Sequence, residues 1–332
     1  MVRVILLVVA AVVGLLIAIE IGLRVLVGLG DRPIYIPDEE IGYLLAPNQK
    51  MRRFGNRIFI NRYSMRSDEF ADVRPAATLR ILLLGDSIAN GAWWTDQAQT
   101  ISAAIAQQLQ TNLPQPFQMV EVLNASANSW GPRNQLAYLK RFGTFDSQIV
   151  VLLLNTDDLF ATAPTSLLVG RDPNYPDRKP YSAIGELLER VFARPKPIPG
   201  IVKVYQEKGD RVSHNLVAIE NIDAIARQNR AQFLLAIAPL LREVDGTAPR
   251  EYEQKARSRL KAFVQTRKIT FVDFLPLFKH SHRPTSLYRD RIHLSPDGNR
   301  LVSDTLTSVI RNQLSVVSDR APETKSDNLL DN

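Results

Sequence analysis

Five short apolar segments, separated by stretches with helical patterns, constrain the fold of this chain more than any other feature. Continuous apolar runs of this kind are typical of the buried strands of parallel sheets, which are covered by helices on both sides. The predicted strands are residues 80–84, 118–123, 149–154, 233–237 and 270–272. Predicted helices lie at about 97–110, 134–142, 215–228, 250–265 and 296–314. The alternation predicts an α/β/α sandwich with a central parallel sheet of about five strands.

Two polar motifs stand where such a sheet carries its chemistry. The first strand ends in Gly85-Asp86-Ser87, at the carboxyl edge of the predicted sheet. Near the end of the chain, Asp290 stands three residues before His293. A serine becomes a good nucleophile when a histidine takes its proton and a carboxylate orients that histidine. Ser87 could instead cap the following helix, and the other two could be plain loop residues. The presence of both motifs favours a split serine-hydrolase site, with Asp86 bracing the turn.

The amino terminus carries an apolar run over residues 4–19, with Arg3 before it. About 20 apolar residues cross a bilayer, and Glu20 and Arg24 can pair one turn apart where such a helix emerges. We expect residues 1–30 to be an uncleaved transmembrane signal anchor, because no convincing cleavage site follows the run. A cleaved signal peptide and a buried core helix are the alternatives. The short end would stay inside, which makes the globular part extracytoplasmic.

The remaining organisation follows from local composition. Residues 31–77 contain prolines and arginines and predict an irregular membrane-proximal lead-in, with a short hairpin around 58–60. Its arginines would form a solvated face, or would bind anionic lipid headgroups or a polyanionic substrate. Residues 78–316 form the main domain. A proline-rich and basic stretch at about 160–213 predicts an insertion over the sheet's carboxyl edge, and residues 317–332 read as a disordered tail.

Composition excludes several chemistries. The chain has no cysteine, so neither disulfides nor thiol redox chemistry is available, and an oxidising compartment is permitted. A net charge of +7 favours anionic partners, but no basic and aromatic motif points to nucleic acid. His280 and His282 lack a neighbouring carboxylate cluster, so we expect no metal site and no cofactor. The sequence contains no Gly-x-Ser-x-Gly elbow, zinc-protease motif or phosphate-binding loop.

From about residue 79 to 314 the chain resembles the SGNH, or GDSL-type, hydrolases, which are serine esterases with a flavodoxin-like fold. Leu84-Gly85-Asp86-Ser87-Ile88 is similar to their nucleophile block, and the stretch from Asp290 to Ser295 is similar to their Asp-x-x-His block. The resemblance implies Ser87 as nucleophile, His293 as base and then acid, and Asp290 as orienting carboxylate. The apolar amino terminus and the stretch 61–66 resemble the membrane-anchored bacterial branch.

The two middle blocks depart from the family pattern. The resemblance implies an oxyanion-hole glycine where this chain has Ser129, whose backbone N–H is retained, with Gly131 as an alternative donor. It implies an asparagine where this chain has Asp157, and an ionised carboxylate offers an oxyanion only repulsion. Losing one such donor costs about 100- to 1000-fold in rate. A protonated Asp157, a donor from Asn155, or backbone donors alone could each compensate.

The function expected from the sequence is a membrane-anchored, exported serine esterase. Its substrate would be an acyl or acetyl ester of a cell-envelope glycan or lipid, an expectation that rests on location and resemblance. An O-acyltransferase on a cell-surface polysaccharide would use the same three residues, and a catalytically weak binding module is a third possibility. Trp93 and Trp94, just after the nucleophile, would pack in the core or stack on a sugar.

Overall fold

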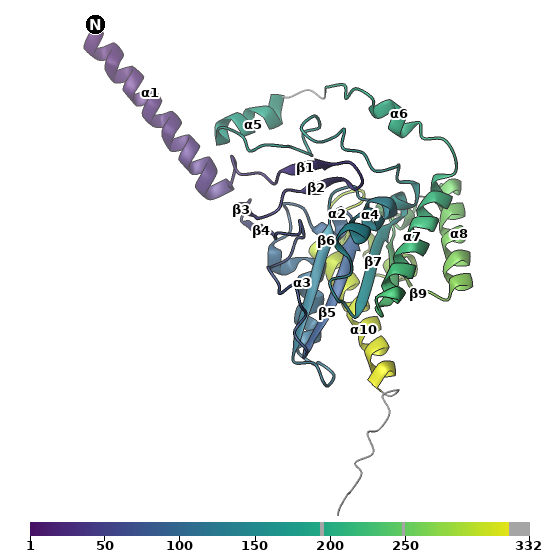
Figure 1. Ribbon diagram of the computed structural model, residues 1–332. Helices are drawn as coiled ribbons and strands as arrows, with labels where there is room; N and C mark the ends of the chain where they lie inside the picture. The colour runs from purple at the N-terminus through teal and green to yellow at the C-terminus, as the bar shows by residue number, and fades with distance from the viewer. Residues whose placement is uncertain (193–195, 248–249, 319–332) are drawn as a thin grey trace, which may run out of the picture.

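The protein is built around one parallel sheet (Figure 1). The computed structural model describes residues 1–192, 196–247 and 250–318. The five strands lie in the order β6-β5-β7-β8-β9, and every neighbouring pair is parallel. Their bounds are β5 Thr78–Gly85, β6 Met119–Ser126, β7 Ile149–Asn155, β8 Gln232–Ala238 and β9 Thr270–Asp273. The predicted sandwich is therefore confirmed, with each strand one to three residues longer than its predicted range.

Helices cover both faces of the sheet, because strands with apolar residues on both faces must be shielded twice. One face packs against α4 (Pro132–Phe142), α7 (Arg211–Gln228) and α8 (Glu251–Arg267). The other packs against α3 (Ile101–Gln110), α9 (Phe274–Lys279) and α10 (Pro296–Ser318). All five predicted helices are present. The predicted tail begins inside α10, and residues 319–332 lie outside the described residues.

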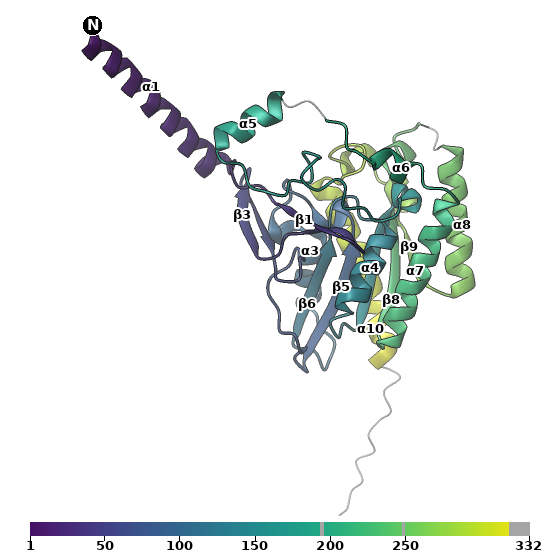
Figure 2. The ribbon, with the colours of Figure 1, turned by 45° about the horizontal axis from the view of Figure 1, so that its top comes forward.

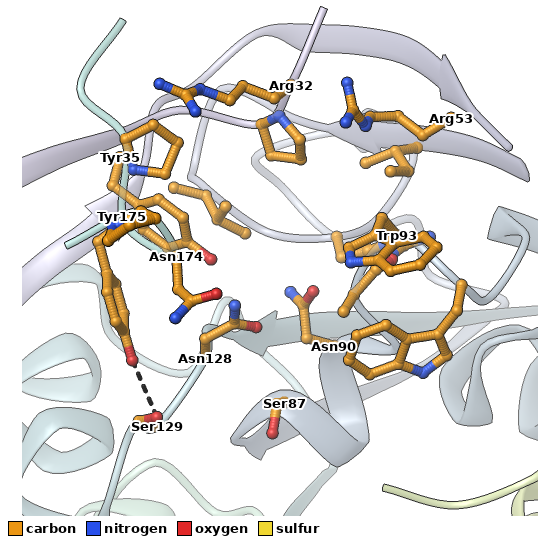
Figure 3. A pocket seen from close by; sticks show the side chains of 18 of the residues that line it. Arg32, Tyr35, Arg53, Ser87, Asn90, Trp93, Asn128, Ser129, Asn174 and Tyr175 are labelled. Atoms are coloured by element: carbon orange, nitrogen blue, oxygen red, sulfur yellow. Dashed lines mark hydrogen bonds between the residues drawn. The ribbon is translucent and has the colours of Figure 1, made fainter. Parts of the chain in front are cut away.

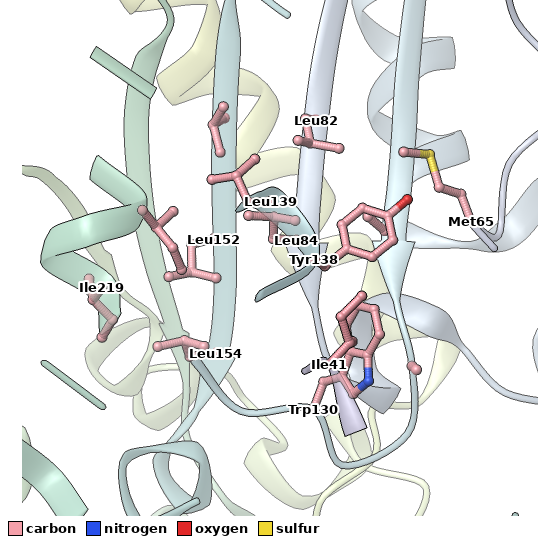
Figure 4. Close-up of a cluster of buried hydrophobic side chains, with 14 of the residues drawn as sticks. Ile41, Met65, Leu82, Leu84, Trp130, Tyr138, Leu139, Leu152, Leu154 and Ile219 are labelled. Carbon is pink, nitrogen blue, oxygen red and sulfur yellow. The ribbon is translucent and has the colours of Figure 1, made fainter. Parts of the chain in front are cut away.

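The core on the first face joins the sheet to segments far away in sequence. Leucines at alternate positions of β5 and β7 point into it, and fully buried residues from α4, α7 and the amino-terminal part complete it. Figure 4 shows these side chains, among them Ile41, Met65, Leu82, Leu84, Tyr138, Leu139, Leu152 and Ile219. Truncating one such leucine to alanine typically costs about 2–5 kcal/mol of stability. The lead-in is thus part of the folded domain.

Helix α1 (Val2–Gly22) projects away from this body (Figure 1) and continues as one wider turn over Leu23–Val27. The segment Val2–Val27 is long and apolar enough to cross a membrane, and none of its most apolar window is buried in the protein. A signal sequence would have the same properties, so the choice between the two belongs to the proposals below. Because the helix is not buried, the buried core helix considered from the sequence is ruled out.

The lead-in is more regular than the sequence predicts. Two antiparallel hairpins occupy it, β1 (Tyr35–Asp38) with β2 (Gly42–Leu45) and β3 (Gln49–Arg53) with β4 (Asn56–Ile60). The hairpin around 58–60 is confirmed, and β1–β2 was missed. The interpretation of the arginines as a solvated face is wrong for Arg53 and Arg66, which are 0% and 1% exposed. Arg53 pairs with a buried carboxylate, and Arg66 donates to the Thr95 carbonyl at 2.6 Å.

The stretch predicted as an insertion runs over the carboxyl edge of the sheet, and Figures 1 and 2 show it from two directions. It carries the short helices α5 (Ala183–Phe192) and α6 (Ile201–Tyr205). At the edge itself lie α2 (Ser87–Asn90) and 3-10 turns at Gln97–Gln99, Thr156–Phe160, Leu241–Glu243 and Pro284–Leu287. The polar residues predicted for the site are therefore gathered at one end of the sheet. The boundaries 160–213 stay a prediction.

Candidate active site

The turn after β5 presents Ser87 at the carboxyl edge of the sheet. Asp86 caps α2 by accepting a hydrogen bond from the Ile88 N–H at 2.8 Å, the bracing role expected from the sequence. A Cβ on Gly85 would lie 2.4 Å from the Cβ of Ala89, so a side chain there would collide with the helix. The glycine allows the helix to pack close to the strand end, and the cap leaves the Ser87 hydroxyl free for another partner.

That partner is His293. The Nε2 atom of His293 lies 3.0 Å from Ser87 Oγ, and its Nδ1 atom lies 2.8 Å from Asp290 Oδ2. The other carboxylate oxygen of Asp290 accepts the N–H groups of Ile292 and His293, both at 2.9 Å. The loop thus holds the carboxylate against the ring. The structure brings the three predicted residues together in the order that proton transfer requires.

The surroundings shift the pKa values of Asp290 and Asp86 in opposite directions. Partial burial raises the pKa of Asp290, but the N–H groups of Ile292 and His293 and the His293 ring outweigh it and leave that pKa below its ordinary value. Asp290 is therefore ionised beside the imidazole. Burial raises the pKa of Asp86, although the Ile88 N–H and the Asn155 amide oppose the shift.

An aromatic ring lies against the imidazole. Trp94 contacts His293 edge to face, with ring centroids 4.6 Å apart. The guanidinium of Arg289 lies over the same Trp94 ring, 5.1 Å from its centroid. Trp93 and Trp94 both line the cavity at Ser87. Neither sequence interpretation of the tryptophans foresaw a contact with the histidine.

The expected oxyanion residues divide into two groups. Ser129 has φ of 55°, a left-handed conformation that favours glycine, and its hydroxyl accepts a hydrogen bond from Tyr175 at 2.9 Å. Within the described part of the chain, no acceptor is paired with the backbone N–H of Ser129 or of Ser87, the first residue of α2. The N–H of Gly131 donates to Asn134 Oδ1 at 3.1 Å, so it is engaged in starting α4.

Asn155 and Asp157 have other partners. The Asn155 amide donates to Asp86 Oδ2 at 2.7 Å, and its Oδ1 accepts the Asp157 N–H at 2.7 Å. The Asp157 carboxylate is 44% exposed and accepts a hydrogen bond from Arg242 at 3.0 Å. Asp158 is buried beneath, where burial and the nearby Asp86 raise its pKa well above the ordinary value. The sequence held no signal for Arg242, which lies 85 residues from Asp157.

Two cavities, each of about 570 Å³, meet at the serine. Both are lined by Ser87, His293, Ser129, Asn174 and Tyr175. The first, here called the tryptophan cavity, also contains both tryptophans and side chains of the lead-in and of α5; Figure 3 shows it with Asn90, Trp93, Asn128 and Asn174. The second, here called the insertion cavity, continues under the insertion and includes Asp157, Phe160, Leu168 and Tyr205.

No metal centre is evident at the site. Among the described residues, no group of three His, Asp or Glu side chains is placed to hold a metal ion. His280, one of the two histidines considered for such a role, contacts the Pro276 carbonyl through Nδ1 at 2.7 Å.

Comparison with known proteins gives one family and several distant structures. The model of the GDSL-like lipase/acylhydrolase family matches residues 83–301. The chain matches no curated protein sequence. Similar solved structures include LAE5, an alpha/beta hydrolase enzyme from the metagenome of Lake Arreo, at 13% identity, covering 69% of this chain and 93% of that one with a TM-score of 0.44.

Two further structures carry enzyme names. A catalytic mutant of Axe2, an acetylxylan esterase from Geobacillus stearothermophilus, is 12% identical and covers 71% of this chain and 94% of its own with a TM-score of 0.45. A lipase/acylhydrolase from Enterococcus faecalis is 12% identical over 70% of this chain and 96% of its own, with a TM-score of 0.44. Likenesses this distant do not bear on the substrate.

Proposed function

Because the chain belongs to the GDSL-like lipase/acylhydrolase family of ester-bond hydrolases, we propose that Ser87, His293 and Asp290 form its catalytic triad. The observation that carries the assignment is the continuous contact from Ser87 Oγ through His293 to Asp290, at 3.0 and 2.8 Å. A serine that merely capped α2 would have no such partner, and Asp86 already performs the capping.

The reaction follows from these contacts. His293 Nε2 takes the proton of Ser87 as Oγ bonds to the ester carbonyl carbon, and Asp290 stabilises the imidazolium. The tetrahedral intermediate collapses, the bond to the alkoxy oxygen breaks, and His293 returns the proton to the leaving alcohol. Water then attacks the acyl-enzyme with His293 again as base, which releases the carboxylic acid and restores Ser87.

The oxyanion would be held by backbone donors. The N–H of Ser87 lies at a helix start, and the N–H of Ser129 lies in a left-handed turn; neither has an acceptor among the described residues. Free, oriented donors of this kind are what developing negative charge requires. Asp157 would contribute no donor, because its carboxylate accepts a hydrogen bond from Arg242.

The two cavities suggest an ester with substantial groups on both sides. An ester carbonyl placed at Ser87 projects its acyl part and its alkoxy part in different directions, and each cavity has room for one. The amides of Asn90, Asn128 and Asn174 beside Trp93 suit a hydroxyl-rich group in the tryptophan cavity, since amides bond hydroxyls and indoles cover sugar faces. A cell-envelope glycan ester or a glycolipid would meet both requirements.

The location proposed for this activity is a membrane surface. The apolar segment Val2–Val27 would be a single-pass anchor, with the hydrolase domain on the extracytoplasmic side. Glu20 and Arg24 pair at 2.6 Å at the end nearest the domain, as expected where a helix leaves the bilayer.

Acyl transfer is the second candidate, and the double cavity favours it specifically. If the alcohol product leaves one cavity while the acyl group remains on Ser87, a sugar hydroxyl can enter in its place and attack instead of water. The residues and the proton transfers are the same.

Reaction of the full-length chain with a fluorophosphonate tests the proposal. We expect covalent labelling of Ser87, located by peptide mass, and loss of labelling in Ser87→Ala and His293→Ala. Ser102→Ala, which changes a buried hydroxyl on α3, is the matched control and should label normally. A folded protein that takes no label at Ser87 would overturn the catalytic assignment and leave the binding module. Products formed from an acylated glycan, with and without acceptor sugar, separate hydrolysis from transfer.

A further inference from the structure

Helix α5 has its charged side inward. Glu186 is fully buried, pairs with Arg53, and accepts the Gly30 N–H at 2.6 Å. Glu189 of the helix pairs with Arg32 of the lead-in at 3.2 Å. Arg190 pairs within the helix with Glu186 at 3.1 Å, and its guanidinium lies over the ring of Phe54, 5.8 Å from the centroid. The face of α5 that contacts the protein is thus its charged face.

The opposite face is apolar and uncovered. Leu187, Leu188, Val191 and Phe192 are 39%, 50%, 64% and 73% exposed. Together with Ile184 they follow the spacing of a single helical stripe. A helix on a water-facing surface has the reverse arrangement, with its apolar stripe against the core. The arrangement of α5 therefore calls for an apolar environment on the outer side.

The start of α5 is attached to the end of α1. The Glu20 carboxylate accepts the N–H groups of Ala183 and Ile184, at 2.8 and 3.0 Å, and Arg24 donates to the Tyr181 carbonyl at 3.1 Å. Figures 1 and 2 both show α5 beginning beside the base of α1 and running across, not along, the direction of that helix. A helix crossing a membrane-spanning helix at its exit lies along the membrane surface.

We propose that α5 is an interfacial helix, whose stripe Ile184, Leu187, Leu188, Val191 and Phe192 rests in the lipid leaflet next to α1. The inference depends on the proposed anchoring through α1. Helices of this kind bury their apolar side about 5–10 Å into the boundary between headgroups and acyl chains. The exposed basic residues Arg178 and Lys196 flank the helix, where they can meet anionic headgroups.

The position of α5 at the lipid surface also affects access to the catalytic site. Glu189 and Arg190 of α5 line the tryptophan cavity, together with Arg32 and Ser87. One wall of the cavity is therefore part of the same helix that touches lipid. An ester carried by a membrane amphiphile would reach Ser87 without leaving the surface of the bilayer.

Spin labelling tests the inference, and the absence of cysteine makes it direct. Single variants Leu188→Cys and Phe192→Cys of the full chain carry a nitroxide in vesicles of phosphatidylcholine and phosphatidylglycerol. Val12→Cys in α1 is the lipid reference, and Val217→Cys, 55% exposed on α7, is the water reference. We expect labels at 188 and 192 to collide mainly with oxygen, which partitions into lipid, and the label at 217 mainly with a water-soluble nickel complex.

Each other outcome has a distinct meaning. Labels at 188 and 192 that behave like the label at 217 would place α5 in water and overturn the inference while a lipid-embedded label at 12 upholds the anchor. Labels protected from both reagents would indicate cover by protein, either a second copy or a partner, and would also overturn it. A label at 12 in water would reject the anchor itself. Fluorophosphonate reaction at Ser87 reports independently on the catalytic proposal.

Discussion

Arg242 donates a hydrogen bond to the carboxylate of Asp157 at 3.0 Å, and the same guanidinium pairs with Glu253 at 2.5 Å. The aspartate at the position where the resemblance implies an asparagine is therefore matched by a cation. Its charge acts on the site only in part, because a neighbouring opposite charge offsets the field that a nascent oxyanion would meet. Asp157, which would repel an oxyanion, and Arg242, which partly offsets its charge, therefore act as one unit.

The first prediction separates the two members of this pair. Arg242→Gln should lower kcat per folded molecule about threefold to tenfold, because the Asp157 carboxylate at the cavity beside Ser87 then lacks its cation; tenfold corresponds to about 1.4 kcal/mol. The same change also removes the partner of the buried Glu253 and lowers stability, so kcat is referred to the folded fraction of each variant. Asp157→Asn alone should leave kcat unchanged or slightly raised. In the double variant, the loss caused by Arg242→Gln should largely disappear, as a double-mutant cycle on ester hydrolysis measures. A large fall in kcat for Asp157→Asn would instead give the carboxylate a role of its own.

The second prediction concerns Trp94. Its edge-to-face contact with the His293 ring, at 4.6 Å, orients the imidazole between Ser87 and Asp290. Trp94→Ala should lower kcat about tenfold to hundredfold, since small misplacements of a reacting group cost that much, with little change in KM. Trp94→Phe should restore most of the rate. Trp93→Ala, which alters the same cavity without touching the ring of His293, should act mainly on KM. Equal effects of both alanine variants on KM would assign Trp94 to substrate binding.

The sequence predicted the sheet well because buried strands have a local signature. Each predicted strand between 80 and 272 is present. The pattern is clearest in β7, which is buried along its whole length, because burial on both faces selects an unbroken apolar run. The motifs at Ser87 and Asp290 were equally readable, because each is set within one turn or loop. The left-handed φ of Ser129 also gives a physical reason for the glycine that the resemblance implies at that position.

What the sequence missed depends on distant partners. Arg53 looked like one more surface arginine, and its burial is decided by Glu186, which lies 133 residues later. The compensation of Asp157 by Arg242 crosses 85 residues in the same way. Local patterns carry no information on such pairs, because each charge alone is compatible with solvent. The hairpin β1–β2 was missed for a different reason, because both strands are only four residues long and β1 contains Pro37.

The third prediction is that the ion pair between Arg133 on α4 and Glu207 in the insertion stabilises the fold in a pH-dependent way. Arg133 donates to Glu207 at 2.5 and 2.8 Å, and this contact holds the pKa of Glu207 at about 2, below its ordinary 4.5. A depressed pKa in the folded state stabilises the fold above pH 4.5, and the stabilisation is lost as the pH falls toward 2. Glu207→Gln should cost about 1–3 kcal/mol near neutral pH, and almost nothing at about pH 2.

Thermal unfolding of both proteins across this range measures the difference. Glu251→Gln, which removes an exposed pair with Lys255 on α8, is the control and should have little effect at any pH. If the stability difference between Glu207→Gln and the parent stayed the same at acid pH, the Arg133–Glu207 ion pair would be excluded as its cause.

The fourth prediction concerns the buried pair that attaches α5. The side chains of Arg53 and Glu186 are 1% and 0% exposed. Removing Arg53 therefore leaves the buried Glu186 carboxylate with one remaining cation, the partly exposed Arg190 at 3.1 Å. Arg53→Met should therefore lower the free energy of unfolding by about 3–5 kcal/mol, because the desolvated Glu186 carboxylate loses its main partner.

The double variant Arg53→Met/Glu186→Leu should recover much of this loss, since two apolar side chains replace two charges in the same space. Arg57→Met, which removes a guanidinium whose side chain is 67% exposed, is the matched control and should cost below about 1 kcal/mol. Denaturant unfolding measures all four proteins, and limited proteolysis between 160 and 213 reports whether α5 detaches first. If the double variant proved as unstable as Arg53→Met, the loss would come from packing around α5, and the charge of Glu186 would not be its origin.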